Sequence, residues 1–139
     1  MKIKLFLLFL ICCSISFSQN FDKKVNDLIL NYENEVIELR HWFHENAELS
    51  NREFKTAKRI EQELIKIGLN PQTGIAKTGV VAVLKGGKPG PVVALRADID
   101  GLPVKERADL PWASKMTGIY NGEKVPVMHA CGHDTHTAI

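Results

Sequence analysis

The sequence has few cysteines and no apolar run long enough to cross a membrane. Three of its 139 residues are cysteine, and two of these lie among the first 18 residues. An apolar run from Leu5 to Ile15 has about 11 residues, too few to span a bilayer as a helix. Basic clusters with interleaved aromatic residues are also absent, which argues against nucleic acid as a partner. We therefore expect no nucleic acid partner and no stable membrane anchor.

The first 18 residues have the pattern of a secretory signal peptide. Two lysines precede the apolar run, and Ser16-Phe17-Ser18 resembles a small-x-small cleavage site. A retained membrane anchor and a lipoprotein signal are the alternatives. Bulky Ile11 before Cys12 argues against the lipoprotein signal, which prefers a small residue there. We predict that residues 1–18 are a signal peptide and that the protein is exported, either to the periplasm or out of the cell.

Residues 19–139 then keep one cysteine, Cys131, in an oxidising compartment. Hydrophobic residues make up 45% of the sequence and charged residues 24%, which is typical of a globular chain. The length suits one small domain. A lone cysteine cannot form an internal disulfide, so Cys131 is expected to be buried, bonded to another molecule, or held by a metal.

Two helices are predicted in the first half of the chain. From Phe21 to about Leu49, apolar residues recur every three or four positions, as on an amphipathic helix. Ser50 to Glu53 then has the pattern of a capping box for a second helix, with Gly68 as its end. The residues expected to be buried on the second helix are Phe54, Ala57, Ile60, Leu64 and Ile67.

A β-hairpin is predicted after the helices. Its strands would be Val80–Lys85 and Val92–Ala97, joined by a glycine- and proline-rich loop. The second strand is apolar on both faces, which predicts a position inside a sheet that is covered on both sides. Residues 105–125 are polar and irregular, so we expect a surface connection with a local turn at Gly122. The order of these elements predicts a layered α/β domain.

Two aspartates follow directly on the predicted buried strand. In open α/β sheets, ligands bind in the crevice beyond the strand ends, where Asp98 and Asp100 would lie. A carboxylate in that crevice could ligate a metal or orient a ligating imidazole. An ordinary turn explains the same residues equally well, since aspartate and glycine before proline are common in turns.

Near the C-terminus, residues 129–136 contain one thiol, three imidazoles and a carboxylate. These side chains bind borderline-soft transition metals, and Gly132 between Cys131 and His133 would let both donors reach one ion. A self-contained structural zinc site would need a second Cys/His pair, which is not present. A buried cysteine beside surface histidines, or a thiol hydrolase with Cys131 as nucleophile, are the other interpretations. Asp134 or Thr135 could cap a helix that begins there.

Three segments of the chain resemble the M20 metallopeptidase family. They are Arg40–Ser50, Gly90–Val104 and Met128–Ala138, and they occur in order and at suitable spacing. The resemblance is to the amidohydrolase branch, which includes hippurate hydrolases, N-acyl-amino-acid amidohydrolases and auxin-conjugate hydrolases. It covers almost all of the chain after residue 18, and the last two segments are highly specific to this branch.

The resemblance implies a metal centre and assigns residues to it. Residues 19–139 would be the N-terminal part of a three-layer α/β/α zinc-exopeptidase-like catalytic domain that binds two divalent ions, zinc or manganese. Cys131 and His133 match two metal ligands, and Asp98 matches the catalytic carboxylate beneath the metals. Asp100 and His136 are candidates for orienting those ligands. Arg96 stands where other branches carry a ligating histidine, for which Cys131 is expected to compensate.

The activity implied is hydrolysis of the amide bond of N-acyl amino acids or small peptides by a metal-activated water. The general base, further ligands and the lid or dimerisation domain are expected downstream of Ile139, so the 139-residue chain alone is expected to be inactive. For the whole protein, homodimer formation is left open. The alternative is a truncated, non-catalytic product that binds metal weakly at most.

Overall fold

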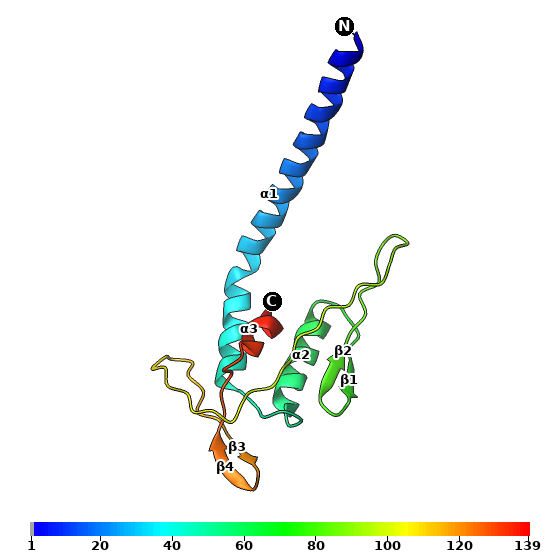
Figure 1. Ribbon diagram of the computed structural model, residues 1–139. Helices are drawn as coiled ribbons and strands as arrows, with labels where there is room; N and C mark the ends of the chain where they lie inside the picture. The colour runs from blue at the N-terminus through cyan, green and yellow to red at the C-terminus, as the bar shows by residue number, and fades with distance from the viewer. Residues whose placement is uncertain (1) are drawn as a thin grey trace. The chain divides into compact units, whose positions relative to one another are not determined.

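The computed structural model describes the backbone of residues 2–139 and the side chains of residues 22–139. The chain divides into two compact units, Met1–Ile37 and Glu38–Ile139. Helix α1, Lys2–Glu45, makes up the first unit and continues into the second (Figure 1). Within the described residues, no helix is both long and apolar enough to cross a membrane. The side chains of the predicted signal peptide, residues 1–18, lie outside that part, so this assignment stays a prediction.

The helix predicted over residues 21–49 is confirmed, although it ends at Glu45. Asn46 closes it, because its backbone N–H and its side-chain amide both donate to the Trp42 carbonyl, at 3.1 and 2.8 Å. The predicted burial of its apolar stripe holds only near the C-terminal end. Phe43 is buried, whereas four earlier members of the stripe are exposed: Val25, Leu28, Ile29 and Tyr32.

Helix α2, Phe54–Lys66, ends where the sequence predicts. Gly68 adopts a left-handed φ of 85°, its N–H donates to the Ile65 carbonyl, and the Leu69 N–H donates to the Leu64 carbonyl. These two bonds form a Schellman motif, and the missing Cβ of glycine makes the left-handed conformation accessible. The predicted buried face is only partly correct, because Ala57 is buried while Phe54 and Ile67 are exposed.

The capping box predicted over Ser50–Glu53 is wrong. Glu53 itself precedes the first helical residue, and no side-chain cap hydrogen bond forms. Its buried carboxylate instead accepts hydrogen bonds from the Asn51 N–H at 2.9 Å and from the Thr78 hydroxyl at 2.7 Å. The Glu48 carboxylate accepts from both the N–H and the hydroxyl of Thr56, at 2.9 and 3.0 Å. The helix start is therefore held by Glu48, which precedes it, and by the distant Thr78, and not by a capping box.

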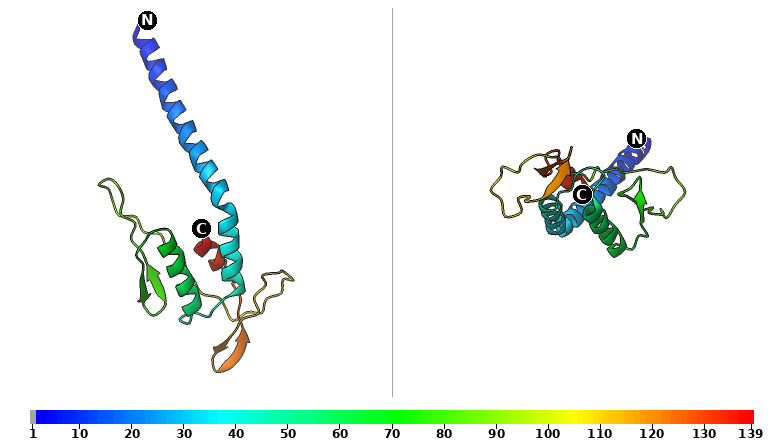
Figure 2. Two further views of the ribbon diagram at one scale, coloured as in Figure 1. Left: turned by 180° about the vertical axis from the view of Figure 1, so that it is seen from behind. Right: turned by 90° about the horizontal axis from the view of Figure 1, so that it is seen from below.

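The hairpin next to α2 is not the predicted one. Strands β1, Gln72–Ile75, and β2, Gly79–Val81, pair antiparallel and lie against α2 in each view (Figures 1 and 2). Residues 82–100 have no regular secondary structure, so the predicted pairing of Val80–Lys85 with Val92–Ala97 is wrong. Of the predicted strand Val80–Lys85, only Val80 and Val81 lie in a strand, β2. Its partner, β1, precedes it in the chain.

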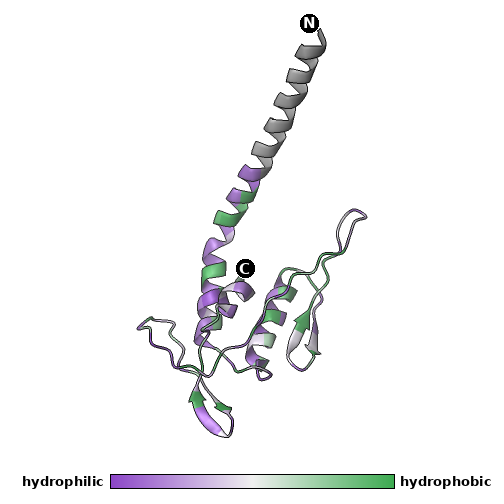
Figure 3. Cartoon of the chain, viewed as in Figure 1, coloured by the Kyte–Doolittle hydropathy of each residue, from purple (hydrophilic) through white to green (hydrophobic). Residues whose placement is uncertain are grey.

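The segment predicted to be a buried central strand is exposed. Val92 is 97% and Leu95 96% exposed, and Figure 3 shows apolar residues along this extended connection. No strand among the described residues pairs with residues 92–97. A strand needs a neighbour for its backbone groups and a cover for its side chains. Residues 22–139 provide neither a pairing strand nor a cover for residues 92–97. These apolar side chains are therefore exposed, although their pattern predicts burial.

A second hairpin occupies part of the region predicted to be irregular. Strands β3, Thr117–Tyr120, and β4, Glu123–Pro126, pair antiparallel around a two-residue loop, Asn121-Gly122. Both loop residues have positive φ, 51° and 85°, as a type I′ turn requires. The predicted turn at Gly122 is confirmed, while the irregular connection over residues 105–125 is corrected.

The core of the second unit is small and lies beside the chemistry-bearing segments. Ala47, Leu49 and Val127 are buried together, with Met116 and Val125 packed against them. Isolated bridges join Leu49 to Gly101 in parallel and Leu102 to Met128 antiparallel. The Gly101 N–H also donates to the Glu48 carbonyl at 2.6 Å. The segment after α1, the segment after Asp100 and the segment before Cys131 are therefore tied to one another.

Gly101 is closely surrounded in this core. A Cβ built there would meet the Val127 Cγ1 at 3.0 Å, the Ala47 Cβ at 3.1 Å and the Met128 carbonyl oxygen at 3.2 Å. Because Val127 and Ala47 are themselves buried, they have little room to withdraw.

We expect Gly101→Ala to lower the free energy of unfolding by about 1–3 kcal/mol, as overpacking does. Denaturant unfolding measures this, with Gly87→Ala as the control, since no atom lies within 4 Å of a Cβ there. If Gly101→Ala and Gly87→Ala had the same free energy of unfolding, the close packing around Gly101 would be contradicted.

Candidate metal centre

The histidine- and cysteine-rich segment forms a tight turn between a bridge and a short helix. Met128 exchanges two backbone hydrogen bonds with Leu102, at 2.8 and 3.1 Å, and so fixes the start of the segment. Gly132 has φ 79°, as the sequence anticipated for the residue between the two donors. Helix α3, His133–Ala138, follows directly. The predicted helix start is confirmed, but capping by Asp134 or Thr135 is wrong, because Gly132 precedes the helix and no side chain caps it.

His133 is oriented by Asp100. Its Nδ1 lies 2.9 Å from the Asp100 carbonyl oxygen and 3.1 Å from the Asp100 Oδ1. A carbonyl oxygen and an ionised carboxylate oxygen accept hydrogen bonds and cannot donate them. Nδ1 therefore carries the proton and donates to them. The other ring nitrogen, Nε2, is then unprotonated in the neutral imidazole and has its lone pair available. This is the tautomer that a metal-ligating histidine has when a neighbouring oxygen holds its other nitrogen.

Neither the Cys131 thiol nor the Asp98 carboxylate is hydrogen-bonded to His133. Cys131 is a free, exposed thiol, which excludes the buried state from the alternatives for this lone cysteine. The Asp98 carboxylate is paired with Arg96 instead, at 2.7 Å, in an exposed ion pair. Such exposed pairs contribute at most about 1 kcal/mol, so they are easily exchanged for other partners. Over residues 22–139, no three histidine, cysteine, aspartate or glutamate side chains lie close enough to hold a metal ion together.

The remaining predicted residue, His136, lies exposed in the last turn of α3. Its backbone N–H donates to the Gly132 carbonyl at 3.2 Å, and its side chain makes no hydrogen bond with the described residues. Nearby, the Thr137 hydroxyl donates to the Asp98 carbonyl at 3.2 Å and ties α3 to the segment that carries both aspartates. Of the five predicted residues, the structure therefore brings together His133 and Asp100 by direct contact. It places Asp98 close to α3 through its backbone only.

A buried ionic cluster beside the turn was not anticipated. His44 of α1 lies between two carboxylates, with Nδ1 at 2.9 Å from the Asp134 Oδ2 and Nε2 at 2.7 Å from the Glu106 Oε2. The Arg40 Nε lies 3.5 Å from the same Asp134 oxygen. The pKa of Glu106 is lowered, mainly by the hydrogen bond from the Ala108 N–H and then by that from His44. The spacing of Arg40 and His44, four residues apart on one helix face, was the available signal.

His129 is a second residue that sequence reasoning left without a role. It is 6% exposed, and neither ring nitrogen has a hydrogen-bond partner among residues 22–139. Burial lowers its pKa, because removal from water disfavours the charged imidazolium, although Asp134 opposes this effect. Its ring centroid lies 6.5 Å from that of His44. His129 is therefore a buried histidine packed beside His44, and its lowered pKa favours the neutral imidazole.

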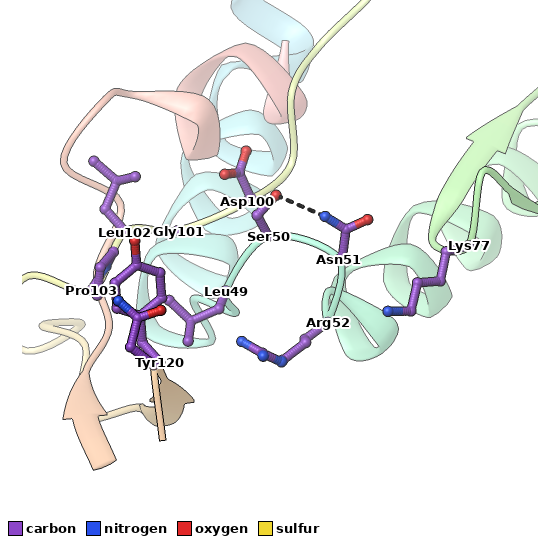
Figure 4. Close-up of a pocket in the computed structure, with 11 residues that line it drawn as sticks. Leu49, Ser50, Asn51, Arg52, Lys77, Asp100, Gly101, Leu102, Pro103 and Tyr120 are labelled. Carbon is purple, nitrogen blue, oxygen red and sulfur yellow. Dashed lines mark hydrogen bonds between the residues drawn. The ribbon is translucent and has the colours of Figure 1, made fainter. Parts of the chain in front are cut away.

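A pocket of about 490 Å³ adjoins Asp100. Figure 4 shows its labelled residues, among them Asp100, Ser50 and Tyr120, together with the cationic Arg52 and Lys77. The Asn51 side-chain amide donates to the Ser50 hydroxyl at 3.4 Å within it. Because Asp100 also holds His133, this pocket shares one residue with the candidate metal centre.

The segment that contains this centre matches a family model. Residues 94–139, which include Asp98, Asp100, Cys131 and His133, match the model of peptidase family M20/M25/M40. The chain belongs to family M20. This match confirms the resemblance seen in the second and third sequence segments, whereas the first, Arg40–Ser50, precedes the matched residues.

Curated relatives extend the match over most of this M20 chain. It is 42% identical over 118 residues to thermostable carboxypeptidase 2 of Saccharolobus solfataricus, covering 84% of this chain and 28% of the relative. N-acetylcysteine deacetylase of Bacillus subtilis is 49% identical over 107 residues, covering 74% and 25%. Hippurate hydrolase of Campylobacter jejuni is 46% identical over 109 residues, covering 78% and 26%. The chain spans about a quarter of the length of these relatives.

Solved structures of M20 proteins have the same fold over this region. A dinuclear metal-binding M20 peptidase of Bacillus subtilis superposes with a TM-score of 0.68 at 42% identity, covering 78% of this chain and 28% of that one. The crystal structure of a putative aminohydrolase from methicillin-resistant Staphylococcus aureus gives a TM-score of 0.72 at 36% identity, covering 84% of this chain and 29% of that one. The predicted α/β class, as part of an M20-type domain, is therefore confirmed.

Proposed function

We propose that this protein is a metal-dependent amidohydrolase that cleaves the amide bond of N-acyl amino acids or small peptides. Its relatives are named as a carboxypeptidase, a deacetylase and a hippurate hydrolase, all of which act on bonds of this type. A similar solved structure is described as a dinuclear metal-binding peptidase. The description of that structure supports divalent metal ions as cofactors, and we propose zinc or manganese.

The observation that carries the proposal is the contact between His133 and Asp100. It fixes the tautomer of His133 that leaves Nε2 free to bind a cation. Two residues away, Cys131 is free and exposed, as a thiol must be before it can bind a metal. A thiolate and an imidazole are the ligands that zinc and its neighbours prefer. The residues present therefore fit half of a metal site.

Each residue near this half-site has a proposed task. Cys131 and His133 would hold one ion, Asp100 would orient His133, and Asp98 would act as the catalytic carboxylate once its exposed pair with Arg96 is broken. His136 is retained as an additional orienting candidate. When bound, a divalent cation supplies polarisation of the amide carbonyl and a lower pKa for an attacking water. The pocket beside Asp100 is the space in which the residues described here could accept part of a small substrate.

Chelation tests this function. We expect the purified full-length protein to release amino acid from N-acetylcysteine or hippurate. We expect a loss of more than about 100-fold in rate after exhaustive chelation, because the metal supplies the main electrostatic stabilisation. Activity should return with zinc or manganese but not with magnesium, which disfavours thiolate ligands. Unchanged hydrolysis after complete metal removal would contradict the proposal.

The same assay separates a thiol hydrolase from a metal enzyme. A reaction with Cys131 as nucleophile would stop on alkylation and continue in a chelator. A metal-ligand role predicts instead that bound metal protects Cys131 from alkylation, and that prior chelation removes this protection. The 139-residue chain alone is expected to show no hydrolysis and at most weak metal binding, because no three metal-competent side chains lie together among residues 22–139.

Export is the proposed localisation. The supporting features are the two lysines, the short apolar run and the small-x-small site within residues 1–18. Mass spectrometry of the protein isolated from its host would give the mature N-terminus, expected at Gln19. An N-terminus that retains residues 1–18 would contradict cleavage. Periplasmic and secreted fractions would be assayed separately.

A further inference from the structure

His44 lies at the centre of the buried ionic cluster next to the candidate metal centre. Its side chain is 11% exposed, and each ring nitrogen contacts a carboxylate oxygen, of Asp134 at 2.9 Å and of Glu106 at 2.7 Å. Ionised carboxylates only accept hydrogen bonds, so both bonds form together only when both ring nitrogens carry protons. Both nitrogens are thereby occupied, which leaves His44 no free lone pair for a metal or for a substrate proton.

The cluster joins three parts of the chain that are far apart in sequence. His44 belongs to α1, Glu106 to the irregular connection after Asp100, and Asp134 to the first turn of α3. Arg40, one turn before His44, also approaches Asp134, at 3.5 Å. Asp134 is buried and can be satisfied only by partners of this kind. The helix end of α1 therefore holds α3 through a charge-assisted bond to one aspartate.

Asp134 is the residue directly after His133. Helix α3 has six residues, too few to be stable by its own backbone bonds, so its position depends on tertiary contacts. Cys131 is exposed and makes no hydrogen bond that would hold it in place. The turn that carries both proposed ligands is anchored by Asp100 on His133 and by His44 on Asp134.

We propose that His44 is a positioning residue for metal binding, which acts through Asp134 to hold the Cys131–His133 turn in the shape that a metal requires. This inference rests on the proposed function, because it concerns the same two ligands. It assigns a role to His44, which contacts neither of the proposed metal ligands and does not line the pocket. The role is geometric, and it fails if the turn keeps its metal affinity without His44.

The variant His44→Gln tests the proposal in the full-length protein. Both donor hydrogens of glutamine are on one amide nitrogen, and its other terminal atom is an acceptor oxygen, so it cannot donate in opposite directions to two carboxylates. We expect zinc or manganese affinity, measured by competition with a chromogenic chelator, to fall about tenfold, as when other outer partners of metal ligands are lost. Measurements are made well below the unfolding temperature of the variant. The matched control is His41→Gln, because His41 lies on the same helix and stacks on Trp112, at 3.7 Å between ring centroids, outside the cluster.

A double-variant cycle identifies the route of the effect. Asp134→Asn alone should also lower metal affinity about tenfold. If His44 acts through Asp134, the combination of His44→Gln and Asp134→Asn should be little worse than either single change. A loss of about 100-fold in the combination would mean independent effects and would overturn the proposed route. A merely structural role predicts a lower unfolding temperature with unchanged metal affinity in every variant.

The outcomes separate this inference from the proposed function. If the unaltered protein takes up neither zinc nor manganese, the proposed function fails, and the inference with it. If the unaltered protein binds metal and His44→Gln binds it equally well, only the positioning role is overturned. Should His44→Gln not fold, Asp134→Asn replaces it, because this change weakens the same His44–Asp134 contact from its other end. A severalfold lower affinity then supports the inference, and an unchanged affinity overturns it.

Discussion

Cys131→Ala is expected to lower the metal affinity of the full-length protein by more than about 100-fold. Loss of an outer hydrogen-bond partner already costs about 10–100-fold, and loss of a thiolate that binds the ion directly should cost more. Because Cys131 is exposed and unpaired, its removal leaves no cavity and breaks no hydrogen bond. Metal content after dialysis, measured by mass spectrometry of the element, gives the result without reliance on activity.

Two further variants make this result specific. Cys131→Ser keeps the size of the side chain but replaces a soft donor by a hydroxyl, so it should lose metal nearly as severely as alanine. Ala130→Ser changes the exposed neighbouring residue and should leave metal content unaltered. Thermal unfolding of all three in the presence of chelator should agree closely. A full metal complement in Cys131→Ala would remove this residue from the proposed ligands.

Asp134→Ala is expected to lower the free energy of unfolding by about 3 kcal/mol in the metal-free protein. The change leaves the Nδ1–H of buried His44 without an acceptor and removes the counter-charge of Arg40. Removal of one partner from a buried ion pair typically costs about 3–5 kcal/mol. We take the lower end, because Glu106 remains in contact with His44. Denaturant unfolding in chelator measures the change.

An exposed aspartate provides the matched control. Asp109 is exposed and has no ion-pair partner in the structure, so Asp109→Ala should change the free energy of unfolding by less than about 0.5 kcal/mol. Asp134→Asn should fall between the two, because its amide keeps the shape and one acceptor oxygen. If Asp134→Ala were as stable as Asp109→Ala, the buried cluster would not contribute to the stability of the fold.

Local signals in the sequence predicted several features well. Glycine at position 68 predicted the end of α2 because only a residue without Cβ adopts the required left-handed conformation easily. The same argument predicted the turn at Gly132 and the turn at Gly122. The hairpin around Asn121-Gly122 was missed, although this dipeptide between two runs is a strong hairpin signal. The strands on either side of it are polar, and this polarity favoured the prediction of an irregular surface connection.

Features that depend on distant partners were predicted poorly. Glu53 was assigned to a local capping box, whereas its carboxylate binds the hydroxyl of Thr78, 25 residues away. The apolar residues 92–97 predicted a buried strand, but burial requires neighbours that residues 22–139 do not place there. The partnership of His44 with Asp134 spans 90 residues and leaves no periodic pattern.

The sequence by itself determined the family, the helices and the identity of the metal-competent donors, because residue types and short spacings encode ligand chemistry and local backbone preference. Which of those donors is oriented, and which partner residue orients it, depends on the tertiary structure. His133 is held by Asp100 across 33 residues, and its neighbour Asp134 is held by His44 of α1. Hydrogen bonds between side chains form only when folding brings them within about 3 Å, and no local rule specifies which distant segments will meet.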